Sequence, residues 1–270
     1  MRGSRPLTER RYALKVCYEG RGFSGSQRQP VERTVEGEFL SALDALKINY
    51  ADFKAAGRTD RGVSALGNVF SFTTDSQLVK ARILNSKLPL DVRVTAVQRV
   101  ESGFNPRHAV ERAYKYFLPD VGFDLALMKT AAKLFIGEQS FHNFSVADDR
   151  NPVRRITRIE VEKKDAVIVL TFAGESFLWQ MVRRMTTALG MAGRGEISQA
   201  EIIGMFDPDV KRKIPPSAPE NLVLWDTVYT FKFNPEEYSH RLLEAVLKKR
   251  LVQMSSQKAI CTEALKEIKK

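Results

Sequence analysis

Alternating and β-branched runs in the first half of the chain predict strands at 12–18, 67–73, 91–100 and 109–118. A helix is expected between the first two strands, because apolar residues recur every four positions at Val35, Phe39 and Leu43. Thr34 suits the N-cap of this helix. A second, short helix is expected at 78–87, before Pro89. The predicted order is therefore strand, helix, strand, helix, strand, strand.

The second half repeats this mixture of elements. Its hydrophobic pattern predicts helices at 123–136, 176–192 and 198–206. Strands are expected at 155–163, 166–173 and 221–232, with a turn at Lys164–Asp165. Both halves suggest helices packed on one face of a mainly antiparallel sheet, in the manner of the ferredoxin-like motif.

These elements predict an α+β fold in three parts. Residues 1–118 and 119–234 would form two ferredoxin-like (RRM-like) halves, although no sequence repeat is visible between them. Residues 235–270 turn polar and helical, which predicts a C-terminal helical tail. The Leu and Val spacing of the tail allows either docking on the body or a partner surface, and docking is favoured.

Composition agrees with a folded protein and adds a partner class. Of 270 residues, 43% are hydrophobic, which is enough for the core of one large domain or two ordinary ones. The 43 Lys and Arg exceed the 32 Asp and Glu, giving a net charge of +11 that favours a polyanionic partner. A basic protein kept soluble by repulsion would have the same surplus. Arginines grouped with Gly, Asn, Gln and aromatic residues, as in RGFSGSQRQPVER and RNPVRRITR, favour nucleic acid.

Several other classes are disfavoured by the sequence. No apolar run has the length of a membrane span, and the N-terminal MRGSRPLTERRY contains no apolar signal-peptide region. The two cysteines, Cys17 and Cys261, and the three histidines are scattered singly, which argues against zinc sites and disulfides. We therefore expect a cytoplasmic protein without a metal ion.

The loop YEGRGFSGSQRQP has glycines at 20, 22 and 25, which is the spacing G-x-G-x-x-G of a dinucleotide-binding loop. In such a loop the helix begins at the glycines, so that its N-terminal amides meet the pyrophosphate. Here Pro30 intervenes and the helix begins only near Thr34. The element order also differs from that of a parallel doubly wound sheet. We infer that this spacing does not indicate a dinucleotide site.

The stretch KAAGRTDRGVSALGNVFSF is more unusual. Asp60 lies between Arg58 and Arg61, and Gly57 and Gly62 free the backbone for tight turning. The two cations favour a charged carboxylate, which could attack an electrophilic carbon or remove a proton. Composition alone favours the alternative, an Arg–Asp pair that ties down a surface loop.

Aromatic and basic residues in later segments are further candidates. Tyr114 and Tyr116 lie two apart on a strand and share a face, either as a platform for a base or as a core pair. The core is favoured for Tyr116. Arg183 and Arg184 lie in mid-helix, where they are either solvated or directed at Asp60 or phosphate.

Seven collinear blocks of the sequence resemble those of one known family. AGRTDRGVSALG resembles the signature G-R-T-D-x-G-V, and FNPRHAVERAYKY resembles F-x-x-R followed by R-x-Y-x-Y. The other blocks are CYEGRGFSGSQ, NSKLPLDVRV, FIGEQSFHNFS, FLWQMVRRMTTALGMAGRG and PPSAPENLVLWDTVY. From about residue 12 to residue 232, the chain is thus similar to the TruA family of tRNA pseudouridine synthases.

The resemblance implies an isomerase that detaches the base of a uridine, rotates it and rejoins it through carbon 5, without cofactor or metal. Asp60 would be the essential carboxylate, attacking C1′ of the sugar or taking a proton from C2′. Tyr114 would stack on the target base and assist the final deprotonation. Arg183 would pair with Asp60, and Arg58 would occupy the place of the extruded uridine in the RNA stack.

The implied substrate is the anticodon arm of tRNA, at tRNA positions 38 to 40, bound in a central cleft between the two halves. The enzyme would read RNA shape and backbone through a basic surface that includes the loop after Tyr18. Family members are homodimers in which each tRNA contacts both subunits, so a homodimer is expected. The implied substrate-binding residues are Tyr114, Leu222, Leu224, Arg21, Gln27, Arg28, Arg61 and Arg107.

Four residues depart from the family pattern: Ser26, Arg61, Ser64 and Asn221. They stand where tryptophan, a small residue, histidine and glycine are common. None of them removes a charge or ring that the chemistry needs, so RNA specificity is the property most exposed to the change. Two rival functions stay open, an RNA-binding module that has lost the chemistry and a nucleoside-bond hydrolase.

Overall fold

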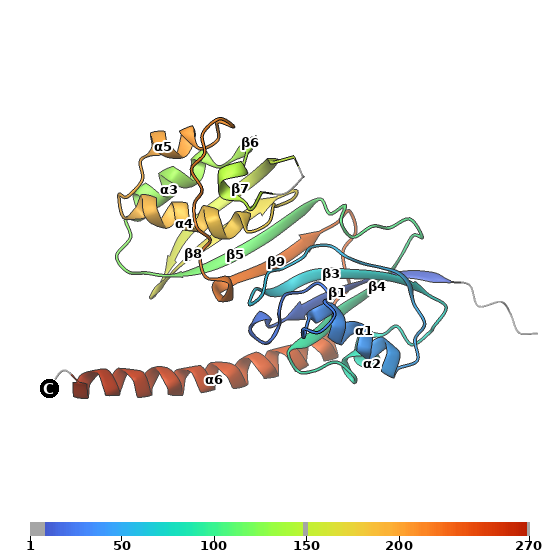
Figure 1. Cartoon of the computed structure of the whole chain (residues 1–270). Coiled ribbons are helices and arrows are strands. Elements are labelled where there is room, and N and C mark those ends of the chain that lie inside the picture. The colour runs from blue at the N-terminus through green and yellow to red at the C-terminus, as the bar shows by residue number, and fades with distance from the viewer. Residues whose placement is uncertain (1–8, 148–150, 269–270) are drawn as a thin grey trace, which may run out of the picture.

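The computed structural model describes residues 9–147 and 151–268, and a single nine-stranded sheet runs through them (Figure 1). The strands are β1 (Arg10–Tyr18), β2 (Ala51–Ala55), β3 (Ser64–Thr74), β4 (Val92–Val100), β5 (Glu111–Pro119), β6 (Gly137–Ser140), β7 (Val153–Lys164), β8 (Val167–Gly174) and β9 (Leu222–Val228). The helices are α1 (Val35–Ala45), α2 (Ala81–Asn85), α3 (Leu125–Leu134), α4 (Met181–Gly193), α5 (Gln199–Gly204) and α6 (Glu237–Ile268).

The strand order is β4-β1-β3-β9-β5-β8-β7-β6, with β2 paired to β3 off this path. Neighbouring strands are antiparallel except for β3 and β9, which pair in parallel through Ser64 with Val223 and Ala65 with Leu224. The expected α+β fold with a mainly antiparallel sheet is confirmed. The expectation of a separate sheet for each half is corrected, because the β3–β9 pairing joins the halves into one sheet.

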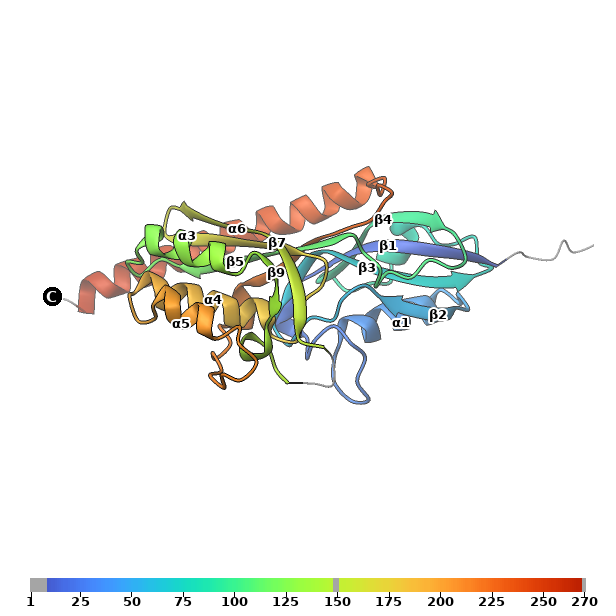
Figure 2. The ribbon, with the colours of Figure 1, turned by 90° about the horizontal axis from the view of Figure 1, so that it is seen from above.

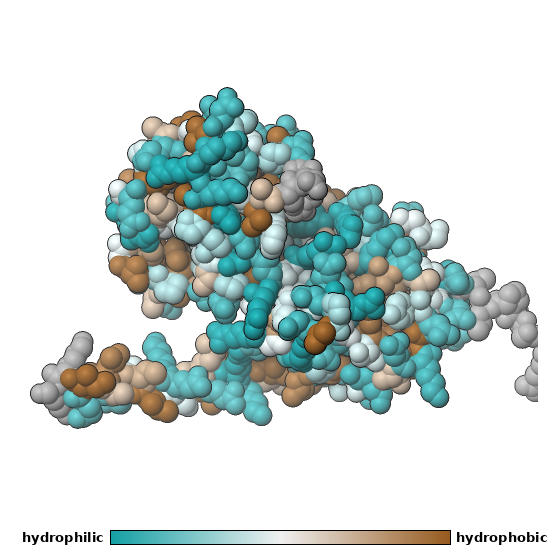
Figure 3. Space-filling view, in the orientation of Figure 1, coloured by the Kyte–Doolittle hydropathy of each residue, from teal (hydrophilic) through white to brown (hydrophobic). Residues whose placement is uncertain are grey.

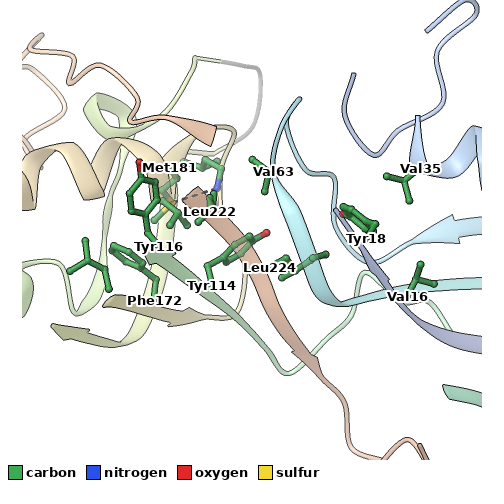
Figure 4. Packing of buried hydrophobic residues seen from close by; sticks show 14 of the residues in the cluster. Val16, Tyr18, Val35, Val63, Tyr114, Tyr116, Phe172, Met181, Leu222 and Leu224 are labelled. Atoms are coloured by element: carbon green, nitrogen blue, oxygen red, sulfur yellow. Dashed lines mark hydrogen bonds between the residues drawn. The ribbon is translucent and has the colours of Figure 1, made fainter. Parts of the chain in front are cut away.

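The main core lies on one face of this sheet, under α1 to α5. Alternate strand residues point into it, such as Leu14 and Val16 of β1 and Leu170 of β8, and all three are buried. Figure 4 shows that the packing continues across the junction of β3 and β9, where Val63 lies opposite Leu222. The core therefore belongs to both halves together.

The predicted elements mostly agree with the structure, apart from boundaries. Thr34 caps α1 by accepting a hydrogen bond from the Gly37 amide, as expected. The helix expected at 176–192 begins only at Met181, because Gln180 has a left-handed backbone with φ of 61°. The strands β2 and β6 were not predicted, since both are short, contain no fully buried residue and show little alternation.

The tail is one helix of 32 residues, α6, and only its first part docks on the body. The Asn85 side chain donates to Ser239 Oγ at 3.0 Å, the Glu236 amide donates to Thr95 O at 3.0 Å, and Arg250 forms an ion pair with Glu19. Beyond Arg250, every described residue is exposed (Figures 1 and 3). The expected docking is therefore wrong for residues 251–268, which extend beyond the body of the protein. We call this segment the free length of α6.

Apolar side chains line part of this free length, but the helix also carries charges throughout. Among the described helices, none is both long and apolar enough to cross a membrane.

Candidate active site

Asp60 lies in the loop between β2 and β3, and side chains from the other half bind both of its oxygens. Arg183 Nη1 donates to Oδ2 at 2.7 Å, and Trp179 Nε1 donates to Oδ1 at 2.9 Å. The ion pair is mostly shielded from water, with side-chain exposures of 11% for Arg183 and 23% for Asp60. A charge-assisted bond in such a setting is stronger than one at an open surface. The carboxylate thus links the two halves beside the β3–β9 junction.

The Arg183 guanidinium is itself fixed by the segment that leads into β9. Its Nε donates to Ser217 O at 2.7 Å. Ser217 in turn donates to Arg183 O, from its amide at 3.2 Å and from its hydroxyl at 2.9 Å. These reciprocal bonds hold the start of α4 and the chain before β9 together, so that Arg183 reaches Asp60 as a rigid donor.

The residues before Asp60 are tied to the first half by a buried network. Thr59 and Ser26 are bonded twice, from Ser26 N to Thr59 O at 3.0 Å and from Thr59 N to Ser26 Oγ at 2.8 Å. The Tyr18 hydroxyl lies 2.8 Å from Thr59 Oγ1, and Asn68 donates to it at 3.1 Å. Asn68 also donates to Gly57 O at 3.0 Å. Ser26, a departure from the family pattern, is therefore part of the scaffold of the Asp60 loop.

The glycines of the G-x-G-x-x-G spacing serve this same scaffold. A Cβ at Gly20 would lie 2.2 Å from Val63 O, so only glycine allows the first loop to pack against the Asp60 loop. Gly25 has φ of 107°, a conformation that other residues rarely adopt. The departing residue Ser64 completes the contact, because its Oγ accepts from the Gly20 amide at 3.0 Å. The structure thus gives these glycines a packing role.

Tyr114, on β5, lies beside this loop. Its ring meets Phe177 edge to face at 5.0 Å between centroids. A Cβ at Gly57 would lie 4.0 Å from the Tyr114 hydroxyl and 3.9 Å from Leu224 Cδ2, which places all three in one small region (Figure 4). Leu222 and Leu224 are 5% and 0% exposed. Burial raises the pKa of Tyr114 to about 12, so its hydroxyl is protonated at neutral pH.

Arg112 is a site residue that was not singled out from the sequence. Its buried guanidinium donates to three backbone carbonyls, those of Ala56 at 3.0 Å, Arg107 at 2.7 Å and Glu175. These carbonyls belong to the end of β2, the F-x-x-R block and the loop after β8. Its position two residues before Tyr114 on a strand puts both side chains on one face, and that spacing was the available signal.

Six residues expected to act on RNA are exposed: Arg21, Gln27, Arg28, Arg58, Arg61 and Arg107. Arg28, Arg58 and Arg107 come from distant segments, and the charges of all three act on Glu36. Burial raises the pKa of Glu36, and a hydrogen bond from the Arg28 amide to Oε2 at 3.0 Å, together with these three charges, partly offsets that effect. The loop that carries Arg21 to Arg28 projects from the side opposite α6 (Figure 2). The structure therefore gathers three of the six around one carboxyl group.

No group of three or more His, Cys, Asp or Glu within residues 9–147 and 151–268 could hold a metal ion. The residues gathered at the site are instead one carboxylate, arginines, a tryptophan, a tyrosine and leucines.

Comparison with known proteins assigns the chain to a family. A family model described as tRNA pseudouridine synthase matches residues 131–230. Over 237 residues the chain is 44% identical to tRNA pseudouridine synthase A of Thermococcus sibiricus, covering 85% of this chain and 89% of the relative. The chain belongs to the tRNA pseudouridine synthase A family.

Other relatives in the tRNA pseudouridine synthase A family agree. The Pyrococcus furiosus protein is 43% identical over 223 residues, 81% of this chain and 84% of its own length. The Methanothermobacter thermautotrophicus protein is 41% identical over 245 residues, 88% of this chain and 89% of its own. The chain is accordingly a tRNA pseudouridine synthase, an isomerase.

Likeness to solved structures is weaker. A chain in the crystal structure of a Cbf5-Nop10-Gar1 complex aligns with a TM-score of 0.36 and 15% identity, covering 66% of this chain and 44% of that one. A score this low does not bear on the fold.

Proposed function

We propose that this tRNA pseudouridine synthase acts on the anticodon arm, at tRNA positions 38 to 40, and that Asp60 is its essential carboxylate. The observation that carries the proposal is the 2.7 Å ion pair between Asp60 and Arg183, which joins the two halves beside the parallel β3–β9 pairing. A negative charge held by an arginine at this depth suits a group that acts as a nucleophile or base.

The reaction breaks the bond between C1′ of the sugar and N1 of the base, and forms a bond from C1′ to carbon 5. The proton on carbon 5 then leaves to solvent. Asp60 would begin the reaction by attacking C1′ or by removing the proton from C2′. The neutral Tyr114 ring would stack on the base, and Leu222 and Leu224 would pack beside it. Arg58, which is exposed, would fill the gap left in the RNA stack.

Exposed cations support recognition of the RNA backbone in a central cleft between the halves. Arg21, Arg28, Arg61 and Arg107, together with Gln27, would contact phosphates and sugars rather than base edges. Such contacts tolerate several sequences, which fits an enzyme that modifies neighbouring positions.

Strand order supports the finer description of the fold as two ferredoxin-like halves. The first half has the order β4-β1-β3-β2 and the second β9-β5-β8-β7-β6. In each, the two outer positions of the order are taken by the last strand and by the strand that follows the first helix. This order places β5 (Glu111–Pro119) in the second half, so we propose subdomains of 1–110 and 111–234 in place of the expected 1–118 and 119–234, with 235–270 as the tail.

The free length of α6 supports the expected homodimer. Its exposed apolar side chains include Leu251, Val252, Met254, Ile260, Leu265 and Ile268. An exposed helix with this many apolar side chains is suited to a protein contact. A second copy would cover this surface.

The test is tritium release from anticodon stem-loops that carry 5-³H-uridine at position 38, 39 or 40. We expect release by the wild type and none by Asp60→Asn, because the amide can neither attack nor remove a proton. Asp75→Asn, an exposed carboxylate in the same half, is the matched control and should release tritium normally.

Each rival function has its own outcome. Tight RNA binding without tritium release by any variant would support the binding module. Free uracil in the supernatant, with an abasic site left in the RNA, would support the nucleoside-bond hydrolase.

A further inference from the structure

Trp179 is an exposed residue whose only polar side-chain group is hydrogen-bonded within the protein. Its side chain is 51% exposed, yet its indole N–H donates to Oδ1 of Asp60. Tryptophan has this single side-chain donor and no acceptor, so its whole hydrogen-bonding capacity is used on Asp60. The other oxygen of Asp60 is bound by Arg183. The two donors therefore share one carboxylate, one on each oxygen.

The backbone around Trp179 holds the indole in this direction. Gln180, the next residue, has φ of 61°, a left-handed conformation that costs energy in a residue other than glycine. Trp179 O accepts from the Val146 amide at 3.0 Å, and Leu178 beside it is buried. The left-handed backbone of Gln180 sets the start of α4 at Met181, and Trp179, just before it, is held where its indole N–H reaches Asp60.

We propose that Trp179 is a positioning residue for the isomerisation. With Arg183, it prevents the Asp60 carboxylate from rotating about its Cβ–Cγ bond before the RNA arrives. A single hydrogen bond would leave that rotation open, whereas bonds to both oxygens fix the plane of the group. Attack on C1′ and removal of the C2′ proton both need a lone pair aimed within a narrow angle. The inference rests on the proposed function, in which Asp60 carries out the chemistry.

Two substitutions separate the indole N–H from the aromatic ring. Trp179→Phe keeps a ring and removes the donor, whereas Trp179→Gln keeps an N–H donor and removes the ring. We expect kcat for tritium release to fall about 10-fold in Trp179→Phe, with KM changed less than about 2-fold, as for loss of one charge-assisted hydrogen bond. Trp179→Gln should retain more of the kcat than Trp179→Phe.

Trp225→Phe is the matched control. It changes the only other tryptophan of the chain, which packs under Lys115 with the ammonium 4.2 Å from its ring centroid. Its kinetics should equal those of the wild type. A wild-type kcat in Trp179→Phe, together with a raised KM in Trp179→Gln, would mean that the ring stacks on RNA, and would overturn the proposal.

The hydrogen bond can be observed directly by NMR on the ¹⁵N-labelled chain. The Trp225→Phe variant has one tryptophan and gives one indole signal, that of Trp179. We expect this signal to lie downfield and to move when Asp60→Asn is added, but not when Asp75→Asn is added. If the chemical shift of the indole signal is unchanged by Asp60→Asn, the hydrogen bond is not formed in solution. That result would overturn the proposal without any activity assay.

Asp60→Asn also separates this inference from the function on which it rests. If Asp60→Asn is inactive and Trp179→Phe has the wild-type kcat, only the positioning role fails. If Asp60→Asn releases tritium like the wild type, the proposed function fails first, and the role of Trp179 fails with it.

Discussion

The loop around Asp60 and the free length of α6 are held in opposite ways. The loop is bound by partners far away in the sequence, such as Ser26 on Thr59 and Arg183 on Asp60. The helix beyond Arg250 is instead held by bonds within its own length, such as Ser255 Oγ to Leu251 O at 2.8 Å and Lys266 to Glu263 at 2.7 Å. A change to the loop should therefore disturb the whole site, while a change to the helix should stay local.

The largest effect is expected from Arg112→Met. This substitution leaves the carbonyls of Ala56, Arg107 and Glu175 without their buried donor. We expect the free energy of unfolding to fall by about 3 kcal/mol, the cost of leaving buried polar groups without partners. We also expect the rate of tritium release to fall by at least about 10-fold, because the segments that flank the site separate. Urea unfolding and single-turnover release measure the two effects.

Arg99→Met, at an exposed position of β4, is the control and should change neither quantity. If Arg112→Met and Arg99→Met unfolded with equal free energy, the long-range hydrogen bonds of Arg112 would not stabilise the site, and the contrast with the free length of α6 would fail.

A smaller effect on the free energy of unfolding is expected when Tyr114→Phe is compared with the wild type, and this effect depends on alkaline pH. Burial raises the pKa of Tyr114 to about 12, whereas an unfolded tyrosine ionises near 10. The stabilisation from the buried, protonated Tyr114 hydroxyl is complete below a pH of about 10 and is lost as pH rises toward about 12. The reason is that Tyr114 loses its proton at a lower pH in the unfolded chain than in the folded one. Relative to Tyr114→Phe, the wild type should lose about 2 kcal/mol over this range.

Urea unfolding at several pH values measures that difference. Tyr238→Phe, which alters an exposed ring at the start of α6, should follow the wild type. If the difference in free energy of unfolding between the wild type and Tyr114→Phe stays constant from a pH of about 10 to about 12, water reaches the Tyr114 hydroxyl in the folded protein.

The smallest effect on stability is expected from deleting residues 251–270. The described part of this segment is exposed and touches little of the body, so the free energy of unfolding of the dilute chain should change by less than about 1 kcal/mol. Sedimentation velocity should show a dimer for the full chain and a monomer for the deletion. Deleting 237–270 also removes Ser239 and Arg250, and should destabilise the body more.

A full-length chain that sediments as a monomer at high concentration would exclude a second copy on α6. A dimer that survives the deletion would place the contact elsewhere.

Local features of the fold could be predicted because local physics determines them. The cap at Thr34 and the turn at Lys164–Asp165 both depend on a few adjacent residues. The common face of Tyr114 and Tyr116 follows from strand periodicity, and both rings lie in the main core.

Features determined by distant contacts could not be predicted in this way. The stretch SFLWQ has helical spacing, yet Gln180 has a left-handed backbone, so the helix begins only at Met181 and Trp179 lies outside it, bonded to Asp60. Arg112 resembles any basic strand residue until the three carbonyls around it are known. Before the resemblance, a pair between Asp60 and Arg183 was one alternative beside a solvated arginine or a phosphate contact, and only the family resemblance singled it out. Their catalytic roles stay predictions.

β9 is the last strand of the chain to be synthesised, but it lies in the middle of the sheet, between β3 and β5. On the ribosome, both of its neighbours are made long before it, and their facing edges stay open until residues 222–228 emerge. The two halves of the site are therefore joined only near the end of translation. A nascent or prematurely terminated chain would carry Asp60 but have no assembled active site.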